Sequence, residues 1–389
     1  MDLQDYFIPL TGLPDEAGYE PGMFGWSVKA FRDAGEFPDL TDTDLAIIGA
    51  GEERNASFNS GCSAAPDEFR KAFYPLYRGN FKPRIADLGN LKNGHTVEDT
   101  YFALSHTISH LMAHDIIPVV IGGSQDLTLA CYQAYEHLGK VINLLHLDSR
   151  FDLGRSSEPV HSHGYLNHII MRQPNYLFNY INLGYQTYLV SPDSVSLMNK
   201  LLFDVRRLGE IRGNITEAEP EARSADLISV DMSVVRQADA PGNHLASPNG
   251  FSSDEICQIM KYAGLSDHST CLGIFEINPE LDRDGQTARL AAQMVWSFID
   301  GYYARVHDFP FTDNDRFVKY TVTIHDHGEE LVFNKSKKSE RWWMDVPVSD
   351  KMKTTYERHH LVPCSYADYE AACRNEIPDR WWQAYQKLM

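Results

Sequence analysis

From about residue 45 onward, the chain alternates short apolar runs with longer segments whose apolar residues recur at helical spacing. The short runs are rich in aliphatic and β-branched residues and end near Gly, Asp, Asn or Ser, as buried strands do. They lie at 45–48, 116–121, 141–147, 181–183, 227–230 and 272–277. The helical spacing marks 66–74, 96–114 and 284–303. This alternation predicts βαβ units and a mainly parallel sheet with helices on both faces.

The pattern changes after about residue 304, where apolar residues recur with a period of two. Runs at 317–325 and 330–333 flank Asp326-His327-Gly328, which predicts a β-hairpin. We expect a final helix that is capped by Ser365 and interrupted at Pro378. The chain is therefore predicted to have an N-terminal extension over 1–44, an α/β domain over 45–303 and a C-terminal extension over 304–389.

The 389-residue chain carries 54 acidic and 35 basic residues, a formal charge of −19. That charge repels phosphate backbones and anionic lipid, so we expect no nucleic-acid and no membrane partner and favour a cationic or zwitterionic small ligand. The six cysteines lie far apart, which is typical of a reducing compartment. Residues 1–22 lack a signal-peptide pattern, and the apolar runs are too short to span a bilayer. These features predict a cytoplasmic protein.

Polar residues follow three predicted strands, at 122–128, 148–152 and 229–233. In open α/β sheets, ligands bind beyond the carboxyl ends of the strands, so these segments form the candidate site. Asp148, Arg150 and Asp152 are spaced two apart, which aims their side chains toward one face of an extended segment. With Asp231 nearby, three carboxylates would need a cation among them, either a metal ion or Arg150. Spacing alone is equally compatible with three exposed loop aspartates that make no mutual contact.

Further motifs keep a recognisable order along the chain. They are Phe58-Asn59-Ser60-Gly61-Cys62 and Ala65-Pro66-Asp67 within 55–74, Ile85-Ala86-Asp87-Leu88-Gly89, His163-Gly164, Phe275-Glu276-Ile277-Asn278-Pro279, Asp282 and Thr287-Ala288. With the polar segments, the series resembles the ureohydrolase family (arginase, agmatinase and formimidoylglutamase), and its N-terminal part is most similar to formimidoylglutamases. The resemblance implies a three-layer αβα fold, metal-dependent hydrolysis of guanidinium or amidine C–N bonds, and a homo-oligomer.

The family holds two manganese ions with two histidines and four aspartates, and this chain matches three of those six positions. The matching residues are Asp148, Asp152 and Asp231. The departures are Gln125 for the first histidine, Arg150 for the second, and Ser233 for one aspartate. By this resemblance the first ion loses only its nitrogen ligand. The second ion loses its histidine and the aspartate that binds it alone.

The altered set predicts no ion or one divalent ion, and no two-manganese centre. Gln125 could contribute a carbonyl oxygen, which would leave an all-oxygen site suited to Mg²⁺, Ca²⁺ or Mn²⁺. We expect Arg150 to occupy the position of the second ion and to donate two parallel hydrogen bonds to Asp148 and Asp231. One divalent ion and one arginine would then cancel the charge of three aspartates.

Two residues within the family motifs are candidates for catalysis and ligand binding. His163 could shuttle a proton and Glu276 could pair with an amidinium, although each taken alone is more simply a loop residue. His146, inside an apolar strand, is expected to be a hydrogen-bonded core histidine. His161 and His168 could replace lost ligands, but their spacing does not require it.

Paired metal ions lower the pKa of a bridging water in this family, so losing one predicts weak hydrolysis or none. The preferred hypothesis is a family member with a disrupted manganese site that binds a guanidino or formimino small molecule, or a protein partner, with little or no hydrolysis. The alternative is an active formimidoylglutamase-like amidine hydrolase with a rebuilt, mononuclear metal site. A structural scaffold is a third option.

Overall fold

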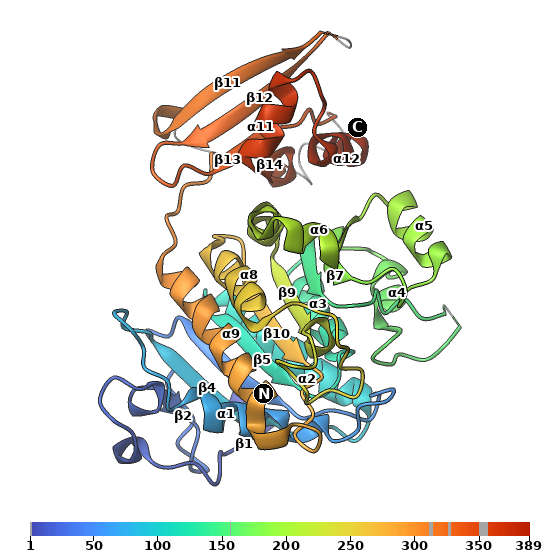
Figure 1. Cartoon of the computed structure of the whole chain (residues 1–389). Coiled ribbons are helices and arrows are strands. Elements are labelled where there is room, and N and C mark those ends of the chain that lie inside the picture. Colours follow the sequence, from blue (N-terminus) through green and yellow to red (C-terminus); the bar gives the residue numbers. More distant parts are fainter. Residues whose placement is uncertain (1, 156, 311–313, 326–327, 350–356) are drawn as a thin grey trace.

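The computed structural model describes residues 2–155, 157–310, 314–325, 328–349 and 357–389. A large α/β domain carries a smaller C-terminal module at one end (Figure 1). The strands of the large sheet lie in the order β1 (Phe7–Ile8), β4 (Ile85–Leu91), β3 (Leu45–Ala50), β5 (Ile117–Gly122), β10 (Cys271–Phe275), β9 (Leu227–Asp231), β6 (Ile142–Leu147), β7 (Leu177–Tyr185) and β8 (Asp204–Arg207), while β2 (Lys29–Ala30) also pairs with β4. Among the described strands of this sheet, only β1 pairs in antiparallel fashion.

The predicted strands and helices form at the expected places. Each predicted apolar run matches a strand of the large sheet, to within one or two residues at its ends except at the start of β7, and every residue of β3, β5, β6, β9 and β10 is buried. A strand covered on both faces needs apolar residues on both, which explains why these strands read as continuous runs. The mainly parallel sheet is therefore confirmed. Strands β1 and β2 lie within the predicted N-terminal extension and pair with β4, so part of that extension belongs to the large sheet.

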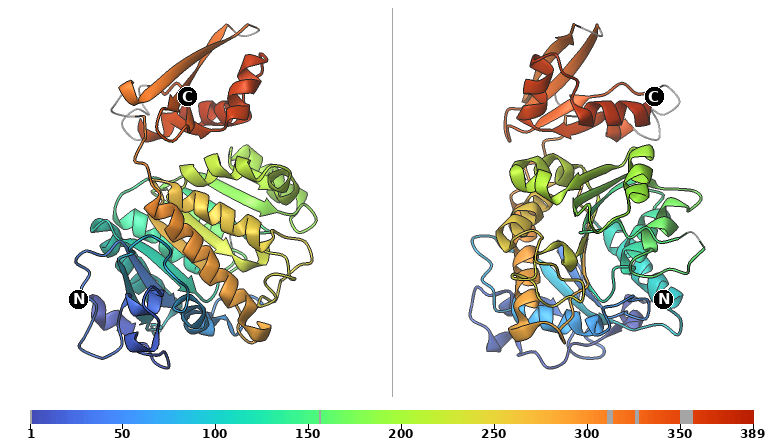
Figure 2. Two further views of the ribbon diagram at one scale, coloured as in Figure 1. Left: turned by 60° about the vertical axis from the view of Figure 1, so that its left-hand side comes forward. Right: turned by 45° about the vertical axis from the view of Figure 1, so that its right-hand side comes forward.

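Helices cover both faces of the sheet, so the domain has three layers: helices, sheet and helices (Figure 2). One face is covered by α1 (Ala65–Phe73), α6 (Leu208–Gly213), α7 (Ala218–Ser224), α8 (Ser253–Leu265) and α9 (Gln286–Tyr303). The other is covered by α2 (Val97–Ala113), α3 (Leu127–His137), α4 (Tyr165–Ile170) and α5 (Pro192–Lys200). A separate hydrophobic core fills each interface. Within the part of the chain that the structure describes, no helix has the length and apolar content needed to cross a bilayer.

Four parallel strands at the centre of the sheet place their carboxyl ends side by side. β5, β10, β9 and β6 are consecutive neighbours in the sheet, although they are far apart in the sequence. The segments that follow them leave the sheet at the same edge. Because the polar motifs lie on these segments, the strand order alone brings the candidate residues together.

The C-terminal module is a four-stranded antiparallel sheet with two helices. Its strands are β11 (Phe317–Ile324), β12 (Glu329–Ser336), β13 (Trp342–Asp345) and β14 (Leu361–Cys364). The predicted hairpin is confirmed as β11 and β12, although residues 326–327 of its turn lie outside the described residues. Ser365 caps α11 (Tyr366–Cys373) as predicted. The interrupted single helix is wrong, because α11 ends at Cys373 and Pro378 is the N-cap of a second helix, α12 (Asp379–Leu388).

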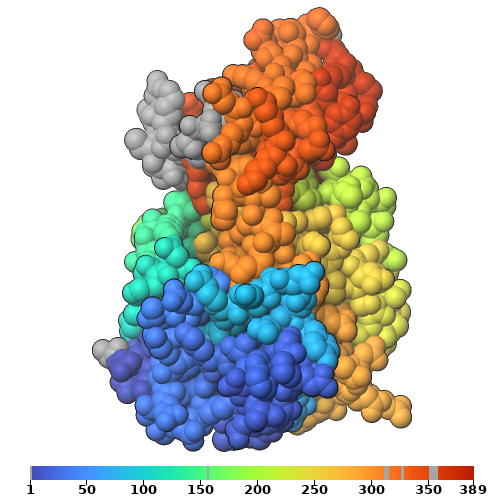
Figure 3. Space-filling view, turned by 90° about the vertical axis from the view of Figure 1, so that its left-hand side faces the viewer, coloured from blue at the N-terminus to red at the C-terminus, as the bar shows by residue number. Residues whose placement is uncertain are grey.

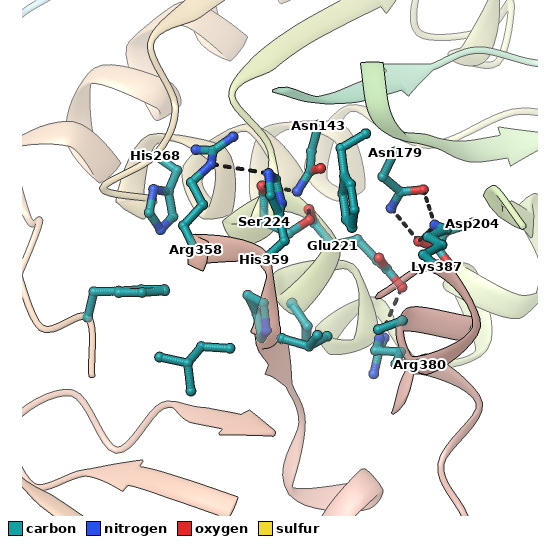
Figure 4. Close-up of a pocket in the computed structure, with 17 residues that line it drawn as sticks. Asn143, Asn179, Asp204, Glu221, Ser224, His268, Arg358, His359, Arg380 and Lys387 are labelled. Carbon is teal, nitrogen blue, oxygen red and sulfur yellow. Dashed lines mark hydrogen bonds and ion pairs between the residues drawn. The ribbon is translucent and has the colours of Figure 1, made fainter. Parts of the chain in front are cut away.

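The module sits directly on the α/β domain (Figure 3) and is held there by ion pairs (Figure 4). Three cations of the module meet three carboxylates of the domain: Arg358 with Asp226 (2.6 Å), Arg380 with Glu221 (3.0 Å) and Lys387 with Asp204 (3.7 Å). A cavity of about 70 Å³ remains between the two parts, lined by Asn143, His268 and His359 among others. Because its charged groups are engaged in these pairs, we place the candidate site elsewhere.

Arg380→Ala should lower the free energy of unfolding by about 3–5 kcal/mol, because this buried cation pairs with Glu221, Glu217 and Asp368, and its loss leaves Glu221 with only the more distant Arg206 (3.7 Å). Urea titration followed by tryptophan fluorescence measures the change, since four of the six tryptophans lie beyond residue 340. As a control, Arg374→Ala breaks an exposed pair with Glu376 and should cost less than about 1 kcal/mol. Equal effects of the two substitutions would show that the buried pair does not hold the module.

Candidate functional site

Acidic and amide side chains converge where the four central strands end. Asp148 follows β6, Asp231 ends β9, Glu276 follows β10 and Gln125 follows β5. Each of these residues is at most 3% exposed. The backbone N–H of Gln125 donates to Oε1 of Glu276 at 2.8 Å, which ties two of the strand ends together. The alternative of exposed, independent loop aspartates is therefore wrong.

Asp152 completes the acidic cluster from the loop after β6. Its φ angle is +50°, a left-handed conformation that aspartate tolerates better than most residues, so the segment turns here instead of staying extended as the spacing suggested. Ligand atoms of His146, Asp148 and Asp152 all lie within 4.8 Å of one another. The turn thus brings the second carboxylate back toward the first.

Three buried oxygen atoms of the site have no hydrogen-bond partner among the described residues. They are Oδ2 of Asp148, Oδ2 of Asp152 and Oε1 of Gln125. Buried polar atoms in native proteins almost always have a hydrogen-bond partner, so three unpaired oxygen atoms in one place need an explanation. A divalent cation would satisfy the two carboxylate oxygens, whose residues lie in one cluster with His146, and a proton shared between Asp148 and Asp152 would take its place when no cation is bound. The donor set therefore fits one metal ion.

The charges of the cluster favour protonation or a bound cation. Burial raises the pKa of Asp148, Asp152 and Asp231, and neighbouring carboxylates raise that of the first two further. The pKa of Glu276 is also raised, chiefly by burial and then by Asp231. Added positive charge would lower all four pKa values by favouring the ionised forms.

Arg150 lies at the site but does not make the predicted double hydrogen bond. Its Nη1 donates to Oγ of Ser149 at 3.3 Å, and no ion pair within 4 Å joins it to any carboxylate of the described chain. Ser233 instead donates its hydroxyl to Oδ1 of Asp148 (3.2 Å) and its backbone N–H to Oδ1 of Asp231 (2.6 Å). These oxygens are thereby engaged. The charge of Arg150 still lowers the pKa of both aspartates, so its role as a replacement cation stays a prediction.

Gln125 is held by three neighbours through its amide nitrogen. Nε2 donates to Oγ of Ser229 (2.8 Å) and to Oγ1 of Thr128 (3.1 Å), and it lies 3.0 Å from Nε2 of His146. His146 is buried and hydrogen-bonded, as expected, but its Nε2 also lies 3.8 Å from Oδ2 of Asp148. Burial lowers the pKa of His146 to about 3, so its ring is neutral. Sequence reasoning missed that this core histidine faces the acidic cluster.

Aromatic rings line the outer side of the site. Phe58 is 62% exposed and stacks on His163 and His244, with ring centroids 5.5 and 6.3 Å apart. Burial, followed by the charge of Arg150, lowers the pKa of His163 to about 4. The next residue, Asn59, donates to Oε2 of Glu276 at 2.8 Å. The exposed ring therefore stands beside the residue that orients the buried glutamate.

Two asparagines and two histidines complete the account of the predicted residues. Asn59 lies in a motif of the sequence and could have been found, whereas Asn243, which donates to the backbone oxygen of Glu276 at 2.9 Å, has no sequence signal. His161 contacts Ser57 and Glu158, and His168 contacts a backbone carbonyl. Neither histidine belongs to the ligand cluster found among the described residues.

Comparison with known proteins decides the family. The model of the arginase family matches residues 43–300, well over half of the chain. The chain belongs to the arginase family. Formimidoylglutamase of Nocardia farcinica is 27% identical over 285 residues, covering 67% of this chain and 88% of that protein. Formimidoylglutamase of Bacillus subtilis is 24% identical over 302 residues, covering 69% and 93%.

Solved structures of the arginase family share the fold. The crystal structure of Bacillus subtilis formimidoylglutamase has a TM-score of 0.63 and 20% identity, and covers 73% of this chain and 96% of that one. Trypanosoma cruzi formiminoglutamase, solved with Mn²⁺, has a TM-score of 0.63 and 19% identity, and covers 69% and 96%. The three-layer fold expected from the resemblance is thus confirmed for this chain.

In the metal-free protein, Asp148→Asn should increase the free energy of unfolding at pH 8 and leave it nearly unchanged at pH 4. Burial and Asp231 raise the folded-state pKa of Asp148 to about 8, above the unfolded value of about 3.9. The stability contributed by the protonated carboxyl is therefore fully present below about pH 4 and is lost as the pH rises through the folded pKa. Asparagine cannot ionise and avoids that loss.

Urea unfolding of the chelator-treated protein at both pH values measures the difference. Asp33→Asn, on an exposed loop, is the control and should have little effect at either pH. A variant at position 148 that is less stable than the parent at pH 8 would contradict the expectation, because it would mean that the ionised carboxylate is already compensated within the chain.

Proposed function

We propose that this arginase-family protein binds a small amidinium- or guanidinium-bearing molecule at a site with one divalent ion, and hydrolyses it slowly or not at all. The observation that carries the proposal is the uncompensated negative charge at the ends of four neighbouring strands. Unpartnered carboxylate oxygens of Asp148 and Asp152 mark where positive charge is missing.

Charge counting sets what the site can hold. Asp148, Asp152, Asp231 and Glu276 contribute four negative charges when ionised. One divalent ion and Arg150 would return three positive charges, which leaves one negative charge for the ligand to neutralise. A monovalent planar cation such as an amidinium meets that requirement, whereas a second divalent ion beside Arg150 would overcharge the site.

The residues of the site supply suitable contacts for a planar cation. Glu276 offers a carboxylate that Asn59 and the backbone of Gln125 already hold in place. Carboxylates bind amidinium groups through charge-assisted, paired hydrogen bonds. The ring of Phe58 stacks on His163 and His244 but stays largely exposed, so it offers aromatic surface to a guanidinium-like cation. The formimidoylglutamase relatives support this class of ligand, because their name denotes a formimidoyl group.

Slow turnover follows from what the chain lacks. A bound ion would act as a Lewis acid toward a polar group of the ligand. Proton transfer would fall to His163, yet a histidine with a pKa near 4 holds a proton poorly at neutral pH. Arg150 is a donor that does not deprotonate in proteins, so it cannot serve as a base. Binding is therefore better supported than hydrolysis.

Glu276→Gln should weaken binding of a guanidinium ligand by about 10- to 100-fold, because the variant loses one partner of a charge-assisted pair. Calorimetry with arginine, agmatine and formiminoglutamate, in the presence of Mn²⁺, measures affinity, while product release is followed in parallel. Glu280→Gln, an exposed glutamate on the same loop, is the matched control and should bind as the parent does.

The proposal expects binding of at least one of these compounds without product above background. Turnover that His163→Ala or Asp148→Ala abolishes would reject it in favour of the alternative, an amidine hydrolase with a rebuilt mononuclear site. The contact of His163 with Phe58 and the closeness of Glu276 to the acidic cluster favour this alternative. Absence of both binding and turnover would reject the two together.

A further inference from the structure

We propose that His146 supplies the nitrogen ligand of the single divalent-ion site, together with Asp148 and Asp152. The histidine missing at position 125 would then be replaced by one from β6, which β10 and β9 separate from β5 in the sheet. This inference deepens the proposed function and rests on its single ion, but it does not depend on which organic ligand binds or on any turnover.

The position of His146 in its strand directs it toward the cluster. It lies two residues before Asp148, which directly follows β6, so the alternation of the strand aims both side chains toward the same face. Its Nε2 is 3.8 Å from Oδ2 of Asp148, and the ligand atoms of all three residues lie within 4.8 Å of one another. Metal–ligand bonds of about 2.0–2.2 Å place two ligand atoms of one ion roughly 3–4 Å apart. Small side-chain rotations would close the remaining gap.

Nε2 of His146 is the ring nitrogen near the aspartates, and without an ion it contacts the amide of Gln125 (3.0 Å) and the hydroxyl of Tyr165 (3.2 Å). Nδ1 lies 2.8 Å from the hydroxyl of Tyr180. With the ring proton on Nδ1, rotation of the Gln125 amide would release the lone pair of Nε2 for an ion. Metal-binding histidines are oriented in the same way, by a polar group that accepts from the nitrogen opposite the metal.

Independent evidence for an ion comes from the orphaned oxygens. Oδ2 of Asp148 is the atom nearest to His146 in this pair, and it lacks any partner among the described residues, as does Oδ2 of Asp152. Both residues are at least nine-tenths buried. The unpartnered Oε1 of Gln125 belongs to the amide that contacts His146, so rotation of that amide would turn an oxygen toward the same point.

This ligand set changes the expected metal. The sequence suggested an all-oxygen site, which suits Mg²⁺ and Ca²⁺ as well as Mn²⁺. An imidazole nitrogen among carboxylates favours transition metals such as Mn²⁺, Co²⁺ or Zn²⁺ over the two harder ions. We therefore expect Co²⁺ and Mn²⁺ to bind more tightly than Mg²⁺.

The test uses the full chain after chelator treatment and the metals alone as probes. Calorimetry with Co²⁺, Mn²⁺ and Mg²⁺ should give one site per chain, with Mg²⁺ the weakest. Pulsed EPR of the Mn²⁺-loaded protein should show the nitrogen coupling of an imidazole ligand. His146→Gln should lower Co²⁺ affinity by at least about 100-fold and remove that coupling.

His161→Gln is the matched control, because it removes a nearby loop histidine that contacts Ser57 and Glu158, and it should leave affinity within about threefold. The EPR signal of the parent protein does not depend on whether a variant folds. Failure of the parent to bind Co²⁺ or Mn²⁺, bound Mn²⁺ without imidazole coupling, or a folded His146→Gln variant with parental affinity would each overturn the inference. Loss of amidinium binding alone would count only against the proposed function.

Discussion

Negative charge buried at the ends of four neighbouring strands is the constraint on which the rest of the site depends. The sheet order β5, β10, β9, β6 forces Glu276, Asp231 and Asp148 into one place, and the turn at Asp152 adds a fourth carboxylate. In a low-dielectric interior, these groups must be protonated, paired or bound to a cation. The neighbours of the cluster, including Ser233, Arg150 and His146, can therefore be understood by how each helps to compensate this buried negative charge.

The rest of the molecule shows that the chain can compensate buried carboxylates by itself. Three such pairs are Asp87 with Arg70 (2.8 Å), Asp226 with Arg358 (2.6 Å) and Glu221 with Arg380 (3.0 Å). Two of them fasten the C-terminal module to the α/β domain. At the candidate site, by contrast, orphaned carboxylate oxygens have no partner within the described chain. A folded chain retains such a deficit at a stability cost, which is typical of sites that bind an external cation.

The sequence predicts the sheet and the identity of the acidic residues well, because both follow from local rules. Strands buried on two faces are continuous apolar runs, and Asp148 and Asp231 directly follow two of them. Long-range contacts were less predictable. Arg150 was expected to bind two aspartate oxygens, but Ser233, in the turn directly after β9, donates to both. The approach of His146, on β6, to Gln125, after β5, is likewise set by the strand order of the sheet and cannot be read from spacing along the sequence.

Anomalous diffraction from crystals grown with Mn²⁺ tests the central claim most directly, because it counts and locates the ions in one experiment. We expect a single manganese peak between Asp148, Asp152 and His146, with the guanidinium of Arg150 directed toward the remaining carboxylate charge. Two peaks about 3.5–4 Å apart, with Arg150 turned out into solvent, would contradict the account.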